Sequence, residues 1–174
     1  MAIFFRPYLF RIMLSIIAIV IIFAVFRPYI VTGGSMSPTF QTGDKLLIER
    51  ISPVFRSLHR GDVVVIRDPR TAGHPIILKR IVGLPNEEVS VDYSGVKITF
   101  PDGTTSYFDS SNAIGGTQNG GIWTMKLGPE DYYVMGDNRS NSTDSRHWGT
   151  IQPHEMIGRP VLRLYPFNRI SFIF

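Results

Sequence analysis

Ser35 lies in a short turn sequence, Gly33-Gly34-Ser35-Met36-Ser37-Pro38. Glycines let a backbone approach a substrate closely and direct several N–H groups at one point. A hydroxyl beside such amides has the arrangement of a nucleophile with an oxyanion hole. The same residues also suit an ordinary Gly-Ser turn, and composition alone favours that simpler interpretation.

Lys79 follows a continuous apolar triplet, Ile76 to Leu78. Such a run is typical of a strand buried on both faces, so the lysine at its end could be desolvated. Burial lowers the pKa of an amine, and a base active near neutral pH must fall roughly 2–3 units below ~10.4. The alternative is a strand-edge lysine whose ammonium lies in water.

Residues 136–149, GDNRSNSTDSRHWG, form a polar segment after the apolar run Tyr132–Met135. Its side chains could position groups through mutual hydrogen bonds, or the segment could be a solvated loop. The polar residues concerned are Asn138, Ser142, Asp144, Ser145 and Arg146. A calcium-binding loop is excluded, because Arg139 and Trp148 would occupy ligand positions.

The N-terminus predicts one membrane-spanning helix over about residues 7–27, within an anchor of residues 1–31. Ile12 to Phe26 carries no charge, and Pro7 to Arg27 would span roughly 30 Å, the thickness of a hydrocarbon core. A cleavable secretory signal and a buried soluble helix are the alternatives. Arg6 and Arg11 precede the apolar core, so the positive-inside rule favours a cytoplasmic N-terminus with residues 32–174 outside.

The remainder of the chain predicts an all-β sandwich or barrel, because short apolar runs alternate with turn signals. The runs expected to form strands are Lys45–Ile48, Val63–Ile66, Ile76–Leu78, Val89–Val91, Val96–Phe100, Tyr132–Met135 and Val161–Leu164. Residues 110–121, rich in Gly, Asn and Ser, predict a flexible loop.

Charge and cysteine content narrow the functional classes. The chain has 174 residues, 18 Lys+Arg and 14 Asp+Glu, and residues 1–31 hold three of the arginines and no acid. The basic balance therefore comes mostly from the apolar N-terminus and gives no reason to expect nucleic-acid binding. The chain has no cysteine, which excludes disulfides, a Cys nucleophile and a thiolate zinc site.

In this order these features resemble one family, the bacterial type I signal peptidases, which remove signal peptides from exported preproteins. The resemblance rests on an N-terminal anchor followed by four blocks of sequence. The blocks are Gly34–Thr39, Gly61–Val65, Leu78–Pro85 and Gly136–Arg146. The last block is long and specific, and the match covers most of the chain.

The resemblance implies a Ser-Lys dyad, with Ser35 as the nucleophile and Lys79 as the general base. Ser142 would orient the Lys79 amine, and Asp144 would form an ion pair with Arg146. The oxyanion hole would be formed by the Ser35 backbone amide with Gly33 and Gly34. The residues implied in substrate binding are Val31, Met36, Phe40 and Leu78.

The family implies a mainly β fold, a β-rich catalytic domain of coiled antiparallel sheets with one N-terminal transmembrane helix. It implies a single-pass enzyme of the cell (inner, cytoplasmic) membrane that cuts after small residues, typically Ala-x-Ala. The partners would be preprotein signal peptides and the lipid bilayer. The mechanism needs no metal or organic cofactor, and the oligomeric state is left open.

Two positions depart from the family pattern. Gly33 stands where some relatives have Ser or Thr, whose hydroxyl completes the oxyanion hole, so backbone amides or water must serve here. Asn86-Glu87 stands where the family commonly has Gly-Asp, and we expect a structural consequence more than a catalytic one.

Four alternatives remain at this point. Ser35, Asp144 and His147 could form a Ser-His-Asp enzyme. The chain could be a membrane-tethered β domain that binds exported peptides without cutting them. Two specialised Ser-Lys relatives are also possible, the mitochondrial inner-membrane peptidase and the conjugative-transfer peptidases.

Overall fold

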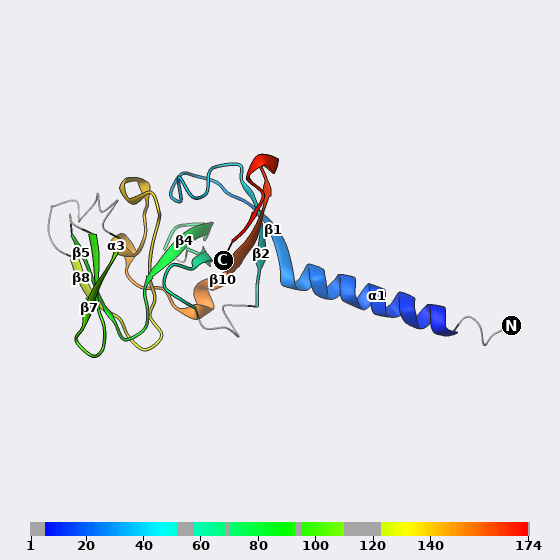
Figure 1. The fold of residues 1–174 in the computed structure, drawn as a ribbon, viewed down its shortest axis with the longest axis horizontal. Helices are drawn as coiled ribbons and strands as arrows, with labels where there is room; N and C mark the ends of the chain where they lie inside the picture. The colour runs from blue at the N-terminus through cyan, green and yellow to red at the C-terminus, as the bar shows by residue number, and fades with distance from the viewer. Residues whose placement is uncertain (1–5, 52–57, 69, 93–94, 110–122, 174) are drawn as a thin grey trace.

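The structure is a computed structural model that describes residues 6–51, 58–68, 70–92, 95–109 and 123–173. One long helix, α1, projects from a β-rich body in which a larger and a smaller sheet lie side by side (Figure 1). The expected loop at residues 110–121 lies outside the described residues.

Helix α1 spans Arg6–Val25, and its 18-residue window Tyr8–Val25 has a mean hydropathy of 2.6. This is long and apolar enough to cross a membrane, and none of the window is buried against the rest of the chain. The helix is therefore not the core helix of a soluble domain, which was one of the alternatives.

The helix ends two residues before the expected Arg27, because Phe26–Ile30 forms strand β1. Pro28 has no N–H to donate to a helix and disfavours a helical conformation at the residue before it. The backbone N–H of Arg50 donates to the carbonyl of Val25 at 3.0 Å, which satisfies one of the last helical carbonyls. The sheet thus begins inside the segment that the sequence assigned to the anchor.

The larger sheet is antiparallel, with the order β1-β2-β10-β3-β4-β9 and β11 paired to β10. Its further strands are β2 Lys45–Glu49, β3 Val63–Arg67, β4 Ile76–Gly83, β9 Tyr133–Met135, β10 Met156–Tyr165 and β11 Ser171–Phe172.

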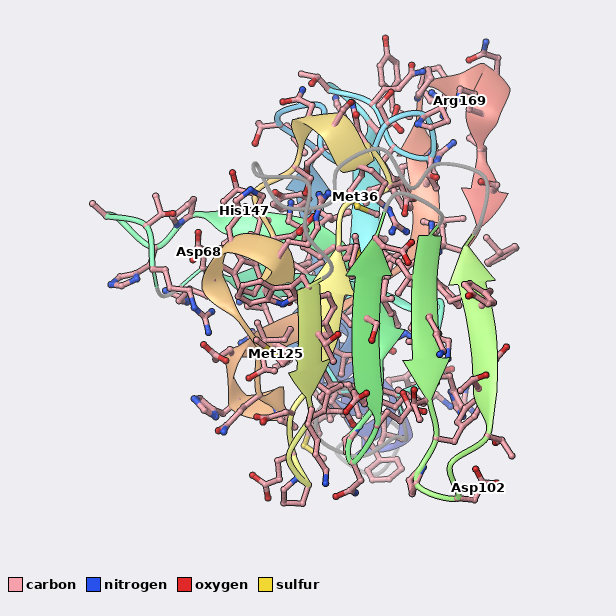
Figure 2. The ribbon with its side chains drawn as sticks, turned by 90° about the vertical axis from the view of Figure 1, so that its left-hand side faces the viewer. Met36, Asp68, Asp102, Met125, His147 and Arg169 are labelled. Carbon is pink, nitrogen blue, oxygen red and sulfur yellow. The ribbon has the colours of Figure 1, made fainter. Side chains whose placement is uncertain are left out.

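The smaller sheet has the order β7-β6-β5-β8 and is also antiparallel. Its strands are β5 Glu88–Asp92, β6 Gly95–Thr99, β7 Thr105–Asp109 and β8 Trp123–Lys126. Figure 2 shows its outer face, with Met125 on β8 and Asp102 in the turn between β6 and β7. Short helical segments follow β9 and precede or follow β10: η1 Arg139–Asn141, α3 Ser145–Trp148, η2 Pro153–Glu155 and η3 Phe167–Arg169.

The mainly β fold with antiparallel sheets and one apolar N-terminal helix is confirmed. Each of the seven expected runs overlaps a strand, and four strands of the described residues were not expected: β1, β7, β8 and β11.

Among the described residues the hydrophobic core has three clusters, and β3 joins two of them. Val63 and Val65 pack in one cluster, and Val64 and Ile66 pack in another on the opposite face. All four are buried, as expected for an uninterrupted apolar strand in the middle of a sheet. The neighbouring strand β4 is held in register against this rigid element, with Lys79 opposite Val64.

Candidate active site

The turn that carries Ser35 is attached to the sheet on both sides. Val31 donates its backbone N–H to Asp44 and accepts that of Gly43, both at 2.9 Å, which closes the loop at its base. Met36 and Phe40 are 2% and 1% exposed, and they fix the turn to the core. Ser35 itself is only partly buried, so its hydroxyl lies on a rigid and accessible turn.

Lys79 is buried in the middle of β4, with 2% of the residue exposed. Desolvation lowers the pKa of its amine, Arg146 lowers it further, and Asp144 and Asp68 act in the opposite direction. The lysine is therefore not the strand-edge residue with a hydrated head that the sequence left possible. The strand continues to Gly83 because Arg80, which follows Lys79, is neutralised by Asp137 in a bidentate pair at 2.6 and 2.7 Å.

The Lys79 amine donates to the Ser142 hydroxyl oxygen at 2.9 Å. Arg146 binds the Asp144 carboxylate bidentately at 2.8 and 2.9 Å, and both side chains are nearly inaccessible. Burial acts to raise the pKa of Asp144, but the Arg146 guanidinium, the Gly136 N–H and the Ser142 hydroxyl together hold it below its usual value. A chain of contacts thus runs from the amine through Ser142 to a fixed negative charge.

Gly136 is the point where the Ser35 turn meets the Lys79 cluster. A Cβ placed on this glycine would overlap the Ser142 hydroxyl and would lie 2.5 Å from the Ser35 carbonyl oxygen. The close approach of these segments therefore requires a residue without a side chain. Ser35, Ser142 and Lys79 come together although they are far apart along the chain.

Asn138 fastens the two segments. Its backbone N–H donates to the Ser35 carbonyl at 2.9 Å, and its side-chain amide donates to the Gly34 carbonyl at 3.1 Å. The sequence indicated Asn138 only as one member of a polar segment, and it missed Gly136 as the contact point. The two glycines of the Ser35 turn and the GDN sequence at 136–138 each indicate a tight turn. Their contact could not be predicted, because it joins segments 104 positions apart.

Replacing Gly136 with alanine is expected to lower kcat by about 100-fold or more, because the methyl group would push Ser142 or the Ser35 turn away from Lys79. Steady-state cleavage kinetics would measure this change. Gly158→Ala is the matched control: its Cβ would also overlap a backbone oxygen, that of Glu49, but within β10, outside these contacts. Equal losses of kcat in two variants with equally lowered Tm would contradict a specific role of Gly136.

The three residues expected to form the oxyanion hole, Gly33, Gly34 and Ser35, are consecutive in one turn. Gly33 has a φ of +82°, a conformation that a residue with a side chain rarely adopts. The carbonyls of Gly33 and Gly34 are occupied by Thr42 and Asn138. Among the hydrogen bonds of the described residues, none uses the Ser35 N–H, so this amide is available to an incoming oxygen.

The four residues expected to bind substrate lie in one buried cluster. Val31, Met36, Phe40 and Leu78 are between 1% and 4% exposed and pack with β2 and β3. They form a filled apolar floor. A neighbouring open cavity of about 210 Å³ includes Tyr29, Ile48, Val65, Ile76 and Ile157 in its wall, which sequence analysis did not indicate.

His147 serves a different purpose from the one required by a Ser-His-Asp enzyme. Its Nδ1 accepts the backbone N–H of Asp144 at 3.5 Å, as part of a capping box at the start of α3. The carboxylate that would orient a catalytic histidine binds Arg146 instead. Within the described ranges, no cluster of three or more His, Asp or Glu residues is arranged to hold a metal ion.

The arrangement can perform nucleophilic chemistry on a carbonyl group. The turn that carries the Ser35 hydroxyl is tied through Asn138 to the polar segment whose Ser142 binds the Lys79 amine. The lowered pKa of that amine increases its neutral, basic fraction at a given pH. A free amide at the hydroxyl-bearing residue can bind the oxyanion that forms.

The family model and the sequence relatives agree on one family. The family model described as "Signal peptidase, peptidase S26" matches residues 6–165. "Signal peptidase I V" of Bacillus subtilis is 35% identical over 151 residues, which cover 82% of this chain and 88% of that protein. "Probable signal peptidase I-2" of Synechocystis sp. is 34% identical over 148 residues, covering 82% of this chain and 65% of that protein. A crystal structure of a signal peptidase I from Enterococcus faecalis has a TM-score of 0.47 and 24% identity, covering 60% of this chain and 97% of that one.

Proposed function

The chain belongs to the signal peptidase family, peptidase S26, and we propose that it removes signal peptides from exported preproteins with a Ser35–Lys79 dyad. The family makes it a serine peptidase that acts on preprotein signal peptides. The observation that carries the dyad is the buried Lys79 amine, held by Ser142 and with a lowered pKa.

In the proposed mechanism the neutral Lys79 amine takes the proton of the Ser35 hydroxyl as Oγ attacks the scissile carbonyl. The resulting oxyanion accepts the Ser35 N–H. Lys79 then returns the proton to the leaving amine, and the acyl enzyme is hydrolysed by a water molecule activated in the same way. Ser142 accepts one N–H of the amine, which directs its lone pair, and Asp144 with Arg146 holds Ser142 in place.

Gly33 and Gly34 contribute to the oxyanion hole through the shape of the turn. Because the Gly33 position carries no hydroxyl, the Ser35 amide is the donor that the chain itself provides, and a water molecule would supply a second. A water molecule is less firmly positioned than a hydroxyl group of the chain, and loss of one fixed oxyanion-hole donor costs about 10²–10³ in kcat. This enzyme would therefore be slower than relatives with Ser or Thr there.

The peptide would bind along an open edge of β4. Residues Ile76–Arg80 pair with β3 on one side, whereas β9 begins to pair on the other side only at Arg80. Within the part of the chain that the structure describes, no strand occupies the second edge from Ile76 to Lys79. An extended peptide can add to such an edge through main-chain hydrogen bonds, which would bring its carbonyl to Lys79 and Ser35.

Preference for small residues would follow from the filled floor below this edge. Met36 and Leu78 are both almost fully buried in the core, and they would form a shallow floor beneath the peptide. Alternate side chains of an extended peptide point to the same face, so the residues one and three before the cut would both meet this floor. Shallow depressions admit alanine and exclude larger side chains by steric clash.

The direct test is cleavage of a preprotein that carries an Ala-x-Ala site by the full chain in detergent. Replacing the alanine before the cut with phenylalanine should lower kcat/KM by at least about 100-fold. The same replacement at the intervening x position is the control and should change kcat/KM little, because that side chain points away. Equal rates for both substrates would contradict the proposed groove, and absence of cleavage of every preprotein would favour a peptide-binding scaffold or a specialised relative.

The proposed location is the cell (cytoplasmic) membrane, with α1 spanning it once and the β domain outside. The exposed apolar α1 supports attachment, and Arg6 and Arg11 before its apolar core support a cytoplasmic N-terminus. A β domain fixed at the bilayer would meet its substrate at a high effective concentration, because the signal peptide is held in the same membrane.

A further inference from the structure

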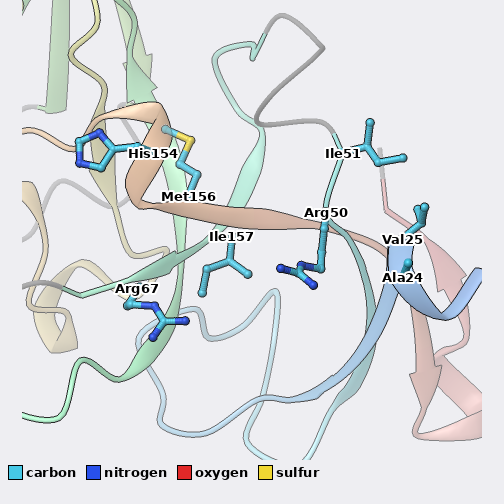
Figure 3. Close-up of a pocket in the computed structure, with 8 residues that line it drawn as sticks. All are labelled: Ala24, Val25, Arg50, Ile51, Arg67, His154, Met156 and Ile157. Atoms are coloured by element: carbon cyan, nitrogen blue, oxygen red, sulfur yellow. The ribbon is translucent and has the colours of Figure 1, made fainter. Parts of the chain in front are cut away.

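Two arginines from separate elements line one open cavity at the end of α1. Arg50 follows β2, and Arg67 is the last residue of β3. The cavity has a volume of about 530 Å³, and its wall includes Ala24 and Val25 from the last turn of the helix. Figure 3 shows the two arginine side chains on either side of Ile157, with Ala24 and Val25 beside Arg50.

Neither guanidinium has a carboxylate partner among the described residues, where the salt bridges involve other arginines. Arg27 lines the adjoining smaller cavity together with both of them. Convergent like charges repel one another, so an anion between them would be stabilised. The carbonyls at the end of α1 favour a nearby cation, which would explain the position of Arg50. They do not explain Arg67, which comes from a different strand.

We propose that this cavity binds the phosphate of an anionic phospholipid in the outer leaflet, through Arg50 and Arg67. The inference rests on the proposed attachment of α1 to a bilayer. If α1 spans the membrane, its last turn lies where the hydrocarbon core gives way to headgroups, and the cavity lies at that level. Ile51, Met156 and Ile157 give the cavity an apolar wall for the glycerol and the first methylenes, which a soluble anion would not use.

The size and charge of the cavity suit this ligand. Cavities of about 300–1,000 Å³ are typical of small-molecule sites. Arginine is suited to phosphate because its planar fork can donate two parallel hydrogen bonds to two oxygens. His154 also lines the cavity and would add a third donor at the far end from α1.

The test compares phosphatidylglycerol with phosphatidylcholine as ligands of the full chain. The protein is reconstituted in nanodiscs of phosphatidylcholine with increasing fractions of phosphatidylglycerol, and the lipids retained on release are counted by native mass spectrometry. We expect selective retention of phosphatidylglycerol, and the double variant Arg50→Gln/Arg67→Gln should weaken it by about ten- to thirty-fold.

The matched control is Lys97→Gln/Lys126→Gln, which removes the same charge from the smaller sheet at the opposite end of the body from α1 (Figure 1). It should retain phosphatidylglycerol as the parent does. If both double variants weakened phosphatidylglycerol retention equally, general electrostatic attraction would explain the binding, and the proposal would be overturned. Equal retention of both lipids by the parent would do the same.

Two further experiments complete the test. The first distinguishes a lipid from a soluble anion, and the second tests whether the chain attaches to a membrane. Displacement of phosphatidylglycerol by millimolar inorganic phosphate, or by a soluble acidic peptide, would assign the cavity to a soluble ligand. Flotation of the parent with phosphatidylcholine vesicles tests attachment separately. A parent that fails to float would remove the membrane premise and this inference with it, whereas floating without selectivity would refute the lipid site alone.

Discussion

Ser35→Ala is expected to lower kcat for preprotein cleavage by at least about 10⁴-fold while leaving the fold intact. The reason is that the reaction would lose its nucleophile, and the remaining turn could only bind and polarise the carbonyl. The Tm should change little, because no hydrogen bond among the described residues depends on the Ser35 hydroxyl, and Met36 and Phe40 anchor the turn in the core. A discontinuous cleavage assay and a thermal melt would measure the two quantities.

Ser37→Ala is the matched control for this experiment. Ser37 is the other serine of the same turn, and its backbone N–H donates to the Gly34 carbonyl, which alanine would preserve. We expect near-parental activity from this variant. A dead Ser37→Ala with an active Ser35→Ala would assign the nucleophile to the second serine.

Lys79→Met should lower kcat by at least about 10³-fold, because no neutral amine would remain to take the serine proton. In the parent, kcat/KM should rise with pH and level off above the pKa of Lys79. The inflection should lie below 10.5, since burial and Arg146 lower that pKa more than Asp144 and Asp68 raise it. A profile that is already flat in the acid range would contradict Lys79 as the base.

The same lysine should make stability depend on pH in a defined direction. Between its lowered pKa and 10.5 the unfolded chain binds a proton that the folded chain does not, so the parent's free energy of unfolding rises with pH. Lys79→Met has no such proton to bind. We therefore expect the variant to be more stable than the parent at neutral pH, with the difference shrinking as the pH approaches 10.5. Chemical denaturation at several pH values would measure it, and a variant that is less stable throughout would show that the amine stabilises the fold.

The apolar triplet before Lys79 indicated a strand with two covered faces, but it left open whether the lysine is buried or has its ammonium in water. The end of that strand was not predicted, because the expected run stopped at Leu78 whereas β4 continues through Arg80 to Gly83. The partner of Arg80, Asp137, lies 57 positions away, and the pair makes the charge compatible with a continuing strand. The local sequence pattern thus indicated the Lys79 amine as a candidate base. It did not indicate the Arg80–Asp137 ion pair, which allows β4 to continue past the lysine.

The local sequence pattern alone did not predict that Ser142 contacts Lys79 or that Gly136 must lack a side chain. Both features depend on how strands that are distant in the sequence pair with each other. Lys79 and Ser142 are 63 positions apart, and only the pairing of β4 with β9 brings the polar segment to the lysine. Strand β1 was missed for a different reason. Pro28 indicated a helix end, and an edge strand also tolerates proline, as the pairing of Pro28 with Leu47 shows.

The direct passage from α1 into β1 limits the distance between the end of the helix and the Ser35 turn. Helix α1 ends at Val25, and β1 begins at Phe26 with no intervening linker. The five residues of β1 rise at most about 17 Å. If α1 spans a bilayer as proposed, the Ser35 turn therefore cannot move far from the plane where α1 would leave it. An extended substrate leaving the same bilayer covers that height in about five residues. The cut position would then be selected by its distance from the membrane as well as by the side chains on either side of it.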